Sequence, residues 1–331
     1  MVLRGAPGSA RDDRLGSSFV YGLGWAAGSG VLGPARASSA DGSVVRPFKL
    51  ESGDGPSAGT RAELRTAVYD DPARAYGARF RGVTFPCAGG RCPAWFVPGT
   101  GSTWAVMVHG KGATRTEPLR AFGAVLRVGM PALVIEYRND GGAPRDPSGF
   151  YRYGQTEWRD LENAVGYALG HGAARVVLFG FSMGGAIVAS FLEHSARADR
   201  VAAVVLDAPM LDFRRTVGHA AAHRRLPLLG TPIPSPLTWS AETIAGWRFG
   251  INWARIDYSD ARWLHVPALV FHGTADATVP ISTSDALAAE YPTLVREVRL
   301  PGVDHVESWN AGPTQYTATV AAFLTGYAKH G

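Results

Sequence analysis

The sequence predicts an α/β fold in which helices flank a largely parallel β-sheet. From about residue 80 onward, short apolar runs with the composition of buried strands alternate with helical patterns. Strands that alternate with helices of this length form right-handed βαβ units, and such units build a mostly parallel sheet. In addition, 46% of the 331 residues are hydrophobic, which is enough to bury a large core. We therefore expect one large α/β domain at residues 80–331, preceded by an accessory segment.

The elements of this domain follow one another in a regular order. The expected strands are 81–85 and 94–98, joined as a hairpin, then 104–109, 132–138, 175–179, 201–206, 268–271 and 294–300. The expected helices are 118–128, 156–169, 185–192, 284–290 and 313–328. Apolar residues recur at helical spacing in the helix at 156–169. We expect its polar residues Glu157, Arg159 and Asp160 to form a solvated face.

Residues 1–79 differ from the rest of the chain. They begin with a stretch rich in Gly, Ser, Ala and Pro, and their hydrophobic periodicity is weak. We expect residues 1–18 to be disordered and residues 19–79 to form an irregular, partly β-like segment.

An insertion at about 211–262 interrupts the alternation of strands and helices. It contains, in order, Pro227, Pro232, Pro234, Pro236, Trp239, Trp247, Phe249, Trp253 and Tyr258, with Trp263 just after it. An aromatic-rich insertion at this level of a sheet predicts a cap over a binding cleft. Packing of these aromatic residues onto the domain explains them equally well.

Charge and motif content exclude several kinds of partner. The formal net charge is +5, but the basic residues are scattered singly, so we expect no nucleic-acid partner. No apolar run approaches the length needed to span a bilayer. Residues 1–14 lack the apolar core of a signal peptide, so we expect a cytoplasmic protein. The chain has no H-E-x-x-H motif, no P-loop and no dinucleotide fingerprint, and we expect neither a metal nor a cofactor.

The chain has two cysteines, Cys87 and Cys92, which flank the loop of the expected hairpin. Cysteines that face each other across such a loop can form a disulfide. A cytosolic setting instead favours two free thiols. A metal site is less favoured, because the chain has no second pair of cysteine ligands.

The stretch Gly180-Phe181-Ser182-Met183-Gly184 carries the strongest chemical signal. It lies between an expected strand and an expected helix. A serine squeezed between these two elements occupies a sharp, strained turn that exposes its hydroxyl group, so that only small residues fit two positions to either side. Ser182 is therefore the predicted nucleophile.

A serine hydroxyl needs a base, and the base needs a group that orients it. His305 and Asp276 each lie in a loop directly after an expected strand. Because the carboxyl ends of parallel strands share one edge of a sheet, these loops can meet Ser182. We predict His305 as the base and Asp276 as the orienting acid, with Asp207 and Asp304 as lesser candidates for the acid.

The anionic oxygen formed during attack on a carbonyl needs two N–H donors. The backbone N–H of Met183 is one predicted donor. The other comes from the loop His109-Gly110-Lys111-Gly112, where the N–H of Lys111 is the first candidate and that of Gly112 the second. The Lys111 ammonium group could instead enter the pocket and favour an anionic substrate, but we favour a role for its backbone. We interpret His109 and His272 as structural histidines.

These motifs together resemble the α/β-hydrolase superfamily, in particular its prolyl-oligopeptidase-like and Bem46-like serine hydrolases. The resemblance covers about residues 80–329. It rests on His109-Gly110, the elbow Gly180–Gly185, the stretch from His272 to Pro280, and His305. A loop that is not a run of glycines argues against lipases that accept bulky tertiary esters. The absence of a propeller in residues 1–79 argues against a true oligopeptidase.

The resemblance implies an α/β-hydrolase fold with a cap and a Ser182–His305–Asp276 triad. It implies a serine hydrolase that cleaves a small-molecule carboxylic ester through an acyl-serine intermediate. A thioesterase, an acyltransferase or a peptidase would use the same triad. A non-catalytic binding module is a further alternative, which the complete set of three residues disfavours.

Overall fold

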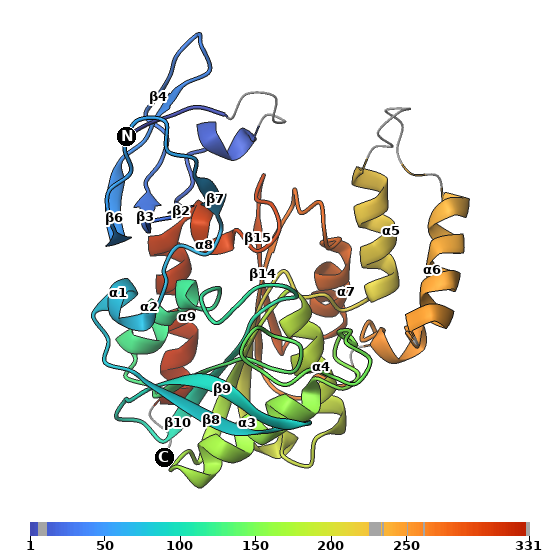
Figure 1. Ribbon diagram of the computed structural model, residues 1–331. Helices are drawn as coiled ribbons and strands as arrows, with labels where there is room; N and C mark the ends of the chain where they lie inside the picture. Colours follow the sequence, from blue (N-terminus) through green and yellow to red (C-terminus); the bar gives the residue numbers. More distant parts are fainter. Residues whose placement is uncertain (6–11, 225–232, 234, 250, 261, 329–331) are drawn as a thin grey trace.

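The computed structural model describes residues 1–5, 12–224, 233, 235–249, 251–260 and 262–328. At its centre lies an eight-stranded sheet in the order β15-β14-β13-β12-β10-β11-β9-β8 (Figure 1). The strands are β8 (Arg81–Cys87), β9 (Gly90–Val97), β10 (Thr103–Val108), β11 (Ala132–Ile135), β12 (Arg175–Phe181), β13 (Val201–Asp207), β14 (Ala268–Gly273) and β15 (Val295–Leu300). Neighbouring strands from β10 to β15 pair in parallel, and β8 and β9 add an antiparallel edge. The predicted fold class, a mostly parallel sheet flanked by helices, is confirmed.

Helices cover both faces of this sheet. They are α2 (Leu119–Arg127), α3 (Trp158–Gly170), α4 (Met183–His194), α7 (Ser282–Glu290) and α9 (Pro313–Ala328). Successive residues of a strand point to opposite faces. On one face, Val106 and Val108 of β10 pack into a core with α3 and α4, and on the other Ala105 and Met107 pack with α2 and α9. Within the described ranges, no helix has the length and apolar character needed to cross a bilayer.

The parallel strands bring the predicted site residues to one edge of the sheet. Lys111 follows β10, Ser182 follows β12, and Asp207 ends β13. Asp276 follows β14 and His305 follows β15. The carboxyl ends of parallel strands point the same way, so these loops leave the sheet at a common edge, where α/β proteins bind their ligands.

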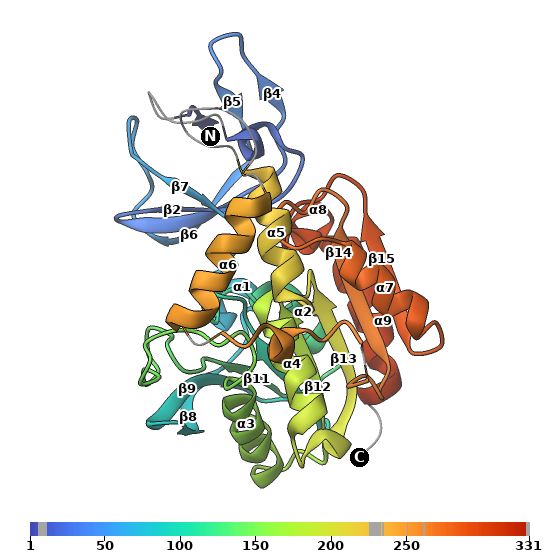
Figure 2. The ribbon, with the colours of Figure 1, turned by 90° about the vertical axis from the view of Figure 1, so that its right-hand side faces the viewer.

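The insertion expected at about 211–262 is largely helical. It contains α5 (Phe213–His223), α6 (Ser235–Phe249) and a short 3-10 helix, η3 (Trp253–Ile256). Figures 1 and 2 show α5 and α6 side by side, outside the central sheet. Trp239 and Trp247 are exposed on α6, whereas Tyr258 is buried in the core. A role for the insertion as a cap stays a prediction. Pro227, Pro232 and Pro234 lie outside the described residues.

Residues 1–79 are more regular than the sequence indicates. They form two small antiparallel sheets, β6-β3-β2-β7 and β1-β5-β4. The elements are β1 (Val2–Leu3), η1 (Asp13–Gly16), β2 (Tyr21–Trp25), β3 (Gly28–Leu32), β4 (Ala37–Ser38), β5 (Val44–Val45), β6 (Phe48–Gly53), β7 (Glu63–Arg65) and α1 (Pro72–Tyr76). The described part of 1–18, expected to be disordered, thus contains β1 and η1, while 6–11 lie outside the described residues. Strands this short and glycine-rich carry too little alternation to be recognised from sequence.

The N-terminal segment packs against the chain that follows His305. Asn310, in the short helix α8 (Ser308–Ala311), donates hydrogen bonds from Nδ2 to the carbonyl oxygens of Val20 (2.7 Å) and Thr66 (3.0 Å). The Tyr21 hydroxyl donates to Glu307 Oε2 at 3.0 Å. These contacts tie the small sheets to one of the loops that carry the site.

Cys87 and Cys92 form a disulfide that closes the loop of the β8–β9 hairpin. The expectation that a cytosolic setting would leave two free thiols is therefore wrong for this structure. The hairpin register explains the pairing, since it holds the two Cα atoms 5.7 Å apart, within the range of natural disulfides. Cys92 is fully buried and Cys87 nearly so.

Reducing this disulfide is expected to lower the free energy of unfolding by about 2 kcal/mol, because the closed loop is short and constrains the unfolded chain only modestly. Urea unfolding with and without dithiothreitol measures this difference. The double variant Cys87→Ser/Cys92→Ser is the control and should be insensitive to the reductant. Identical unfolding midpoints of the wild type under both conditions would contradict the prediction.

Candidate active site

The turn between β12 and α4 holds Ser182 in an unusual backbone conformation. Its φ is 51° and its ψ is −116°, a region that residues other than glycine seldom occupy. A Cβ atom on Gly180 would lie 2.7 Å from the Gly184 carbonyl oxygen, and one on Gly184 would lie 2.3 Å from the Val108 carbonyl oxygen. Both distances are shorter than real Cβ contacts. Close packing of the turn therefore accounts for the glycines on either side of Ser182.

His305 is hydrogen-bonded to both Ser182 and Asp276. Its Nε2 lies 2.8 Å from Ser182 Oγ, and its Nδ1 lies 2.7 Å from Asp276 Oδ2. A carboxylate only accepts hydrogen bonds, so Nδ1 donates to Asp276 and Nε2 remains to accept the hydroxyl proton of Ser182. This is the geometry in which an imidazole can act as a base toward a serine hydroxyl.

Asp276 is buried and held in its ionised form by several donors. Its Oδ1 accepts the backbone N–H groups of Thr278 and Val279, each at 2.8 Å. Burial by itself would raise the pKa of this carboxyl, but hydrogen bonds from His272 and His305 outweigh it and hold the pKa well below its ordinary range. His272 Nε2 lies 3.3 Å from Asp276 Oδ2, and its Nδ1 is hydrogen-bonded to Ser284 Oγ at 2.7 Å. Its placement fits the structural role that we expect for it.

The two lesser candidates for the acid have other partners. Asp207 is buried, its Oδ1 accepts a hydrogen bond from Ser308 Oγ at 2.7 Å, and burial raises its pKa. Asp304 Oδ1 accepts the backbone N–H of Ala277 at 3.0 Å and that of His305 at 2.7 Å. Of the three carboxylates, Asp276 is the one joined to the His305 ring.

The loop after β10 packs directly against Ser182. A Cβ atom on Gly110 would lie 3.0 Å from the Cβ of Ser182. The N–H of Gly110 already donates to Glu117 Oε2 at 2.7 Å, so the next N–H, that of Lys111, remains as a candidate donor. Met183 is the first residue of α4, where backbone N–H groups have no partner within the helix. Met183 thus directly follows Ser182, and Lys111 directly follows the packed Gly110; their roles as oxyanion donors stay predictions.

The side chain of Lys111 extends into a small cavity. Its Nζ donates to the Tyr153 hydroxyl at 3.0 Å and lies 5.2 Å from the centre of that ring. The cavity has a volume of about 210 Å³ and is lined by Lys111, Gly149, Phe150, Tyr151, Tyr153 and Ile251. The ammonium group thus borders this cavity, and the two predicted roles for Lys111, through its backbone or through its ammonium group, stay predictions.

Sequence reasoning missed a buried connection between the loops after β10 and β15. Arg120 of α2 donates to Asn310 Oδ1 at 2.7 Å and also to the carbonyl oxygen of Val306. Its guanidinium lies 3.7 Å from Glu117, which in turn accepts the N–H of Gly110. Arg120 is buried among apolar residues of α2, and a charged residue on the apolar face of a helix is the signal that could have identified it.

A comparison with protein families matches residues 148–248 to a family described as "Serine aminopeptidase, S33". The matched segment includes Ser182 but ends before Asp276 and His305. Two uncharacterized proteins, from two strains of Mycobacterium tuberculosis, are each 29% identical to this chain over 231 residues. The alignment covers 66% of this chain and 69% of each relative.

Solved structures share the architecture at low sequence identity. A Pyrococcus furiosus esterase superposes with a TM-score of 0.62 at 17% identity, covering 78% of this chain and 95% of the esterase. An α/β hydrolase from a Penicillium species superposes with a TM-score of 0.56 at 18% identity, covering 76% of this chain and 99% of that protein. This chain has the α/β-hydrolase fold. The resemblance noted from the motifs is confirmed at the level of the fold, which is what the likeness to the solved structures shows.

Proposed function

We propose that this protein is a serine hydrolase that cleaves a small carboxylic ester through an acyl-Ser182 intermediate. The observation that carries the proposal is the continuous hydrogen-bonded chain from Ser182 Oγ through His305 to Asp276. It supplies a nucleophile, a base and a group that orients the base within hydrogen-bonding distance of one another.

In the proposed mechanism, His305 Nε2 takes the proton of Ser182 as Oγ attacks the ester carbonyl carbon. The backbone N–H groups of Lys111 and Met183 hold the resulting anionic oxygen. His305 then gives the proton to the departing alcohol, which leaves acyl-Ser182. Water, deprotonated by His305, attacks the acyl group and releases the carboxylic acid and the free serine. Throughout, Asp276 fixes the imidazole tautomer and stabilises the imidazolium.

The cavity lined by Lys111 supports a small substrate, because the backbone of Lys111 is also a proposed oxyanion donor and so connects this cavity with the proposed site. At about 210 Å³ it is smaller than the roughly 300–1,000 Å³ typical of pockets for drug-sized ligands. Its aromatic lining suits an apolar acyl or alcohol group of a few carbon atoms. A peptidase is the second candidate, because the family model that matches residues 148–248 is described as a serine aminopeptidase.

A substrate panel separates these two candidates. We expect kcat/KM to be highest for p-nitrophenyl acetate or butyrate and to fall at least about tenfold for the octanoate and palmitate esters, since a long chain exceeds the cavity. Aminoacyl p-nitroanilides should react more slowly than the short esters, and Ser182→Ala provides the background rate. A preference for aminoacyl anilides would favour the peptidase, and a preference for long chains would contradict the assigned cavity.

A further inference from the structure

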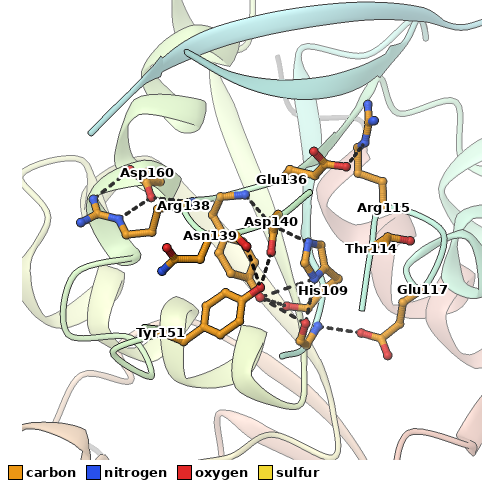
Figure 3. Close-up of polar contacts among 12 residues, drawn as sticks. His109, Thr114, Arg115, Glu117, Glu136, Arg138, Asn139, Asp140, Tyr151 and Asp160 are labelled. Atoms are coloured by element: carbon orange, nitrogen blue, oxygen red, sulfur yellow. Dashed lines mark hydrogen bonds and ion pairs between the residues drawn. The ribbon is translucent and has the colours of Figure 1, made fainter. Parts of the chain in front are cut away.

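His109 is the first residue of the loop after β10, which also carries Lys111, and its ring is fully buried. Both of its nitrogens face oxygen atoms (Figure 3). Its Nδ1 is 2.8 Å from the Gly110 carbonyl oxygen, and its Nε2 is 2.9 Å from Asp140 Oδ2. The ring also stacks on Tyr137, with 4.6 Å between the ring centres. The proposed mechanism gives this histidine no step.

The partners of His109 define its charge. Asp140 also accepts the backbone N–H of Tyr137 at 2.8 Å and the hydroxyl of Tyr151 at 2.9 Å, so it acts as a carboxylate acceptor toward each of its neighbours. The Gly110 carbonyl likewise can only accept. A ring placed between two acceptors must donate from both nitrogens, which requires the doubly protonated imidazolium. Burial opposes this charged form, but the hydrogen bond to Asp140 and the charge of that carboxylate outweigh burial and raise the pKa of His109.

The imidazolium holds one peptide group of the loop in a single orientation. The carbonyl oxygen of Gly110 accepts the Nδ1–H of His109. The Tyr137 hydroxyl lies 3.2 Å from this Gly110 oxygen and 3.1 Å from the His109 carbonyl oxygen. The N–H of Gly110 is bonded to Glu117 (Figure 3). In a planar trans peptide the C=O and the following N–H point in opposite directions. With the Gly110 carbonyl turned into the buried network, the Lys111 N–H must point away from it.

We propose that His109 is a positioning residue, whose doubly donating ring, anchored by Asp140, fixes the Gly110 peptide so that the Lys111 N–H meets the anionic oxygen. The inference rests on the proposed function, because it assigns a donor for that reaction. A purely structural histidine would only stabilise the loop, whereas here the rate of the chemical step depends on the charge of the buried His109 ring.

The test uses Asp140→Asn in the full-length protein. An amide keeps the shape of Asp140 but removes the negative charge that favours the buried imidazolium. A neutral ring donates from one nitrogen only, so it can no longer donate to both residue 140 and the Gly110 carbonyl. We expect kcat for p-nitrophenyl butyrate to fall by about 10- to 100-fold, somewhat less than the effect of deleting an oxyanion donor outright. KM should change by less than about threefold. The affinity for a trifluoromethyl ketone, which forms the same anionic oxygen, should fall in parallel with kcat.

The matched control is Glu136→Gln. Glu136 is a largely buried carboxylate in the same loop region and is paired with Arg115 at 2.9 Å. Glu136→Gln should leave kcat within about twofold of the wild type.

Tyr137→Phe is the second variant, to be used if Asp140→Asn fails to fold. It removes the hydroxyl near the Gly110 carbonyl while keeping the backbone N–H that Asp140 accepts, and we expect a smaller loss of kcat, about three- to tenfold.

A spectroscopic measurement determines the protonation state of the His109 ring directly. With ¹⁵N-labelled histidine at neutral pH, the two His109 nitrogens should both show protonated imidazolium shifts in the wild type, assigned by their loss in His109→Gln. A neutral His109, or Asp140→Asn and Tyr137→Phe variants with wild-type kcat, would overturn the positioning role while leaving the proposed function intact. A folded wild type that neither hydrolyses esters nor reacts with a fluorophosphonate would overturn both.

Discussion

Replacing Ser182 with alanine is expected to lower kcat for p-nitrophenyl butyrate by on the order of 10⁶-fold, to the residual rate that binding and oxyanion stabilisation alone support. The hydroxyl is the atom that would form the covalent intermediate, so no neighbouring group can replace it. The melting temperature should stay close to that of the wild type, because the change removes one oxygen atom and leaves the turn intact. Steady-state kinetics and thermal unfolding of the purified variant measure both quantities.

A serine within α4 provides the control for this experiment. Ser190 is fully buried, eight residues after Ser182, and Ser190→Ala should keep kcat within about twofold of the wild type. Loss of activity in Ser190→Ala, or retention of full activity in Ser182→Ala, would refute Ser182 as the nucleophile.

The second large effect is expected for Asp276→Asn, which should lower kcat by on the order of 10⁴-fold. The amide can donate to His305 Nδ1, and it then stabilises the tautomer whose Nε2 carries a proton and cannot accept one from Ser182. Because hydrogen bonding keeps the pKa of Asp276 below its ordinary range, the carboxylate stays ionised wherever a histidine base titrates. The pH dependence of wild-type kcat above about pH 4, the ordinary pKa of an aspartate, should therefore not include the titration of Asp276.

Asp207→Asn is the matched control for Asp276→Asn. Asp207 is also a buried carboxylate at the end of a central strand, and its bond with Ser308 can persist with an amide. We expect its kcat to remain within a few-fold of the wild type. An enzyme that tolerates Asp276→Asn but not Asp207→Asn would show that the acid has been assigned to the wrong strand.

The central sheet could be predicted from sequence because its inner strands, β10 to β14, are buried on both faces. Each strand and helix expected from residue 104 onward is present, with ends shifted by a few residues. Ser182 could be located in its turn because close packing requires glycine at positions 180 and 184, and these glycines form a local sequence motif around it. Predicting Asp276 and His305 required one further inference. The loops that follow parallel strands leave the sheet at one edge, so residues distant in sequence can meet there.

Other features depend on tertiary contacts that leave no local pattern. Glu157 and Asp160, expected on a solvated face, are both fully buried. Glu157 accepts the backbone N–H groups of Arg152 and Gly154, and Asp160 is bonded to Arg138 at 2.7 Å. Helical spacing predicts which side of a helix is apolar, but not that a neighbouring loop will bury its polar side. The sequence offered both a disulfide and free thiols for Cys87 and Cys92, and the expected compartment favoured the wrong one, because the hairpin register brings the two cysteines together.

Labelling with a fluorophosphonate tests the central claim most directly, because the reagent reacts with a serine hydroxyl only when a base activates it. The wild type, treated at neutral pH and digested, should carry one label, on the peptide that contains Ser182. The label should be absent from Ser182→Ala and strongly reduced in Asp276→Asn. A correctly folded wild type that stays unlabelled, or that carries the label on a different serine, would contradict the account.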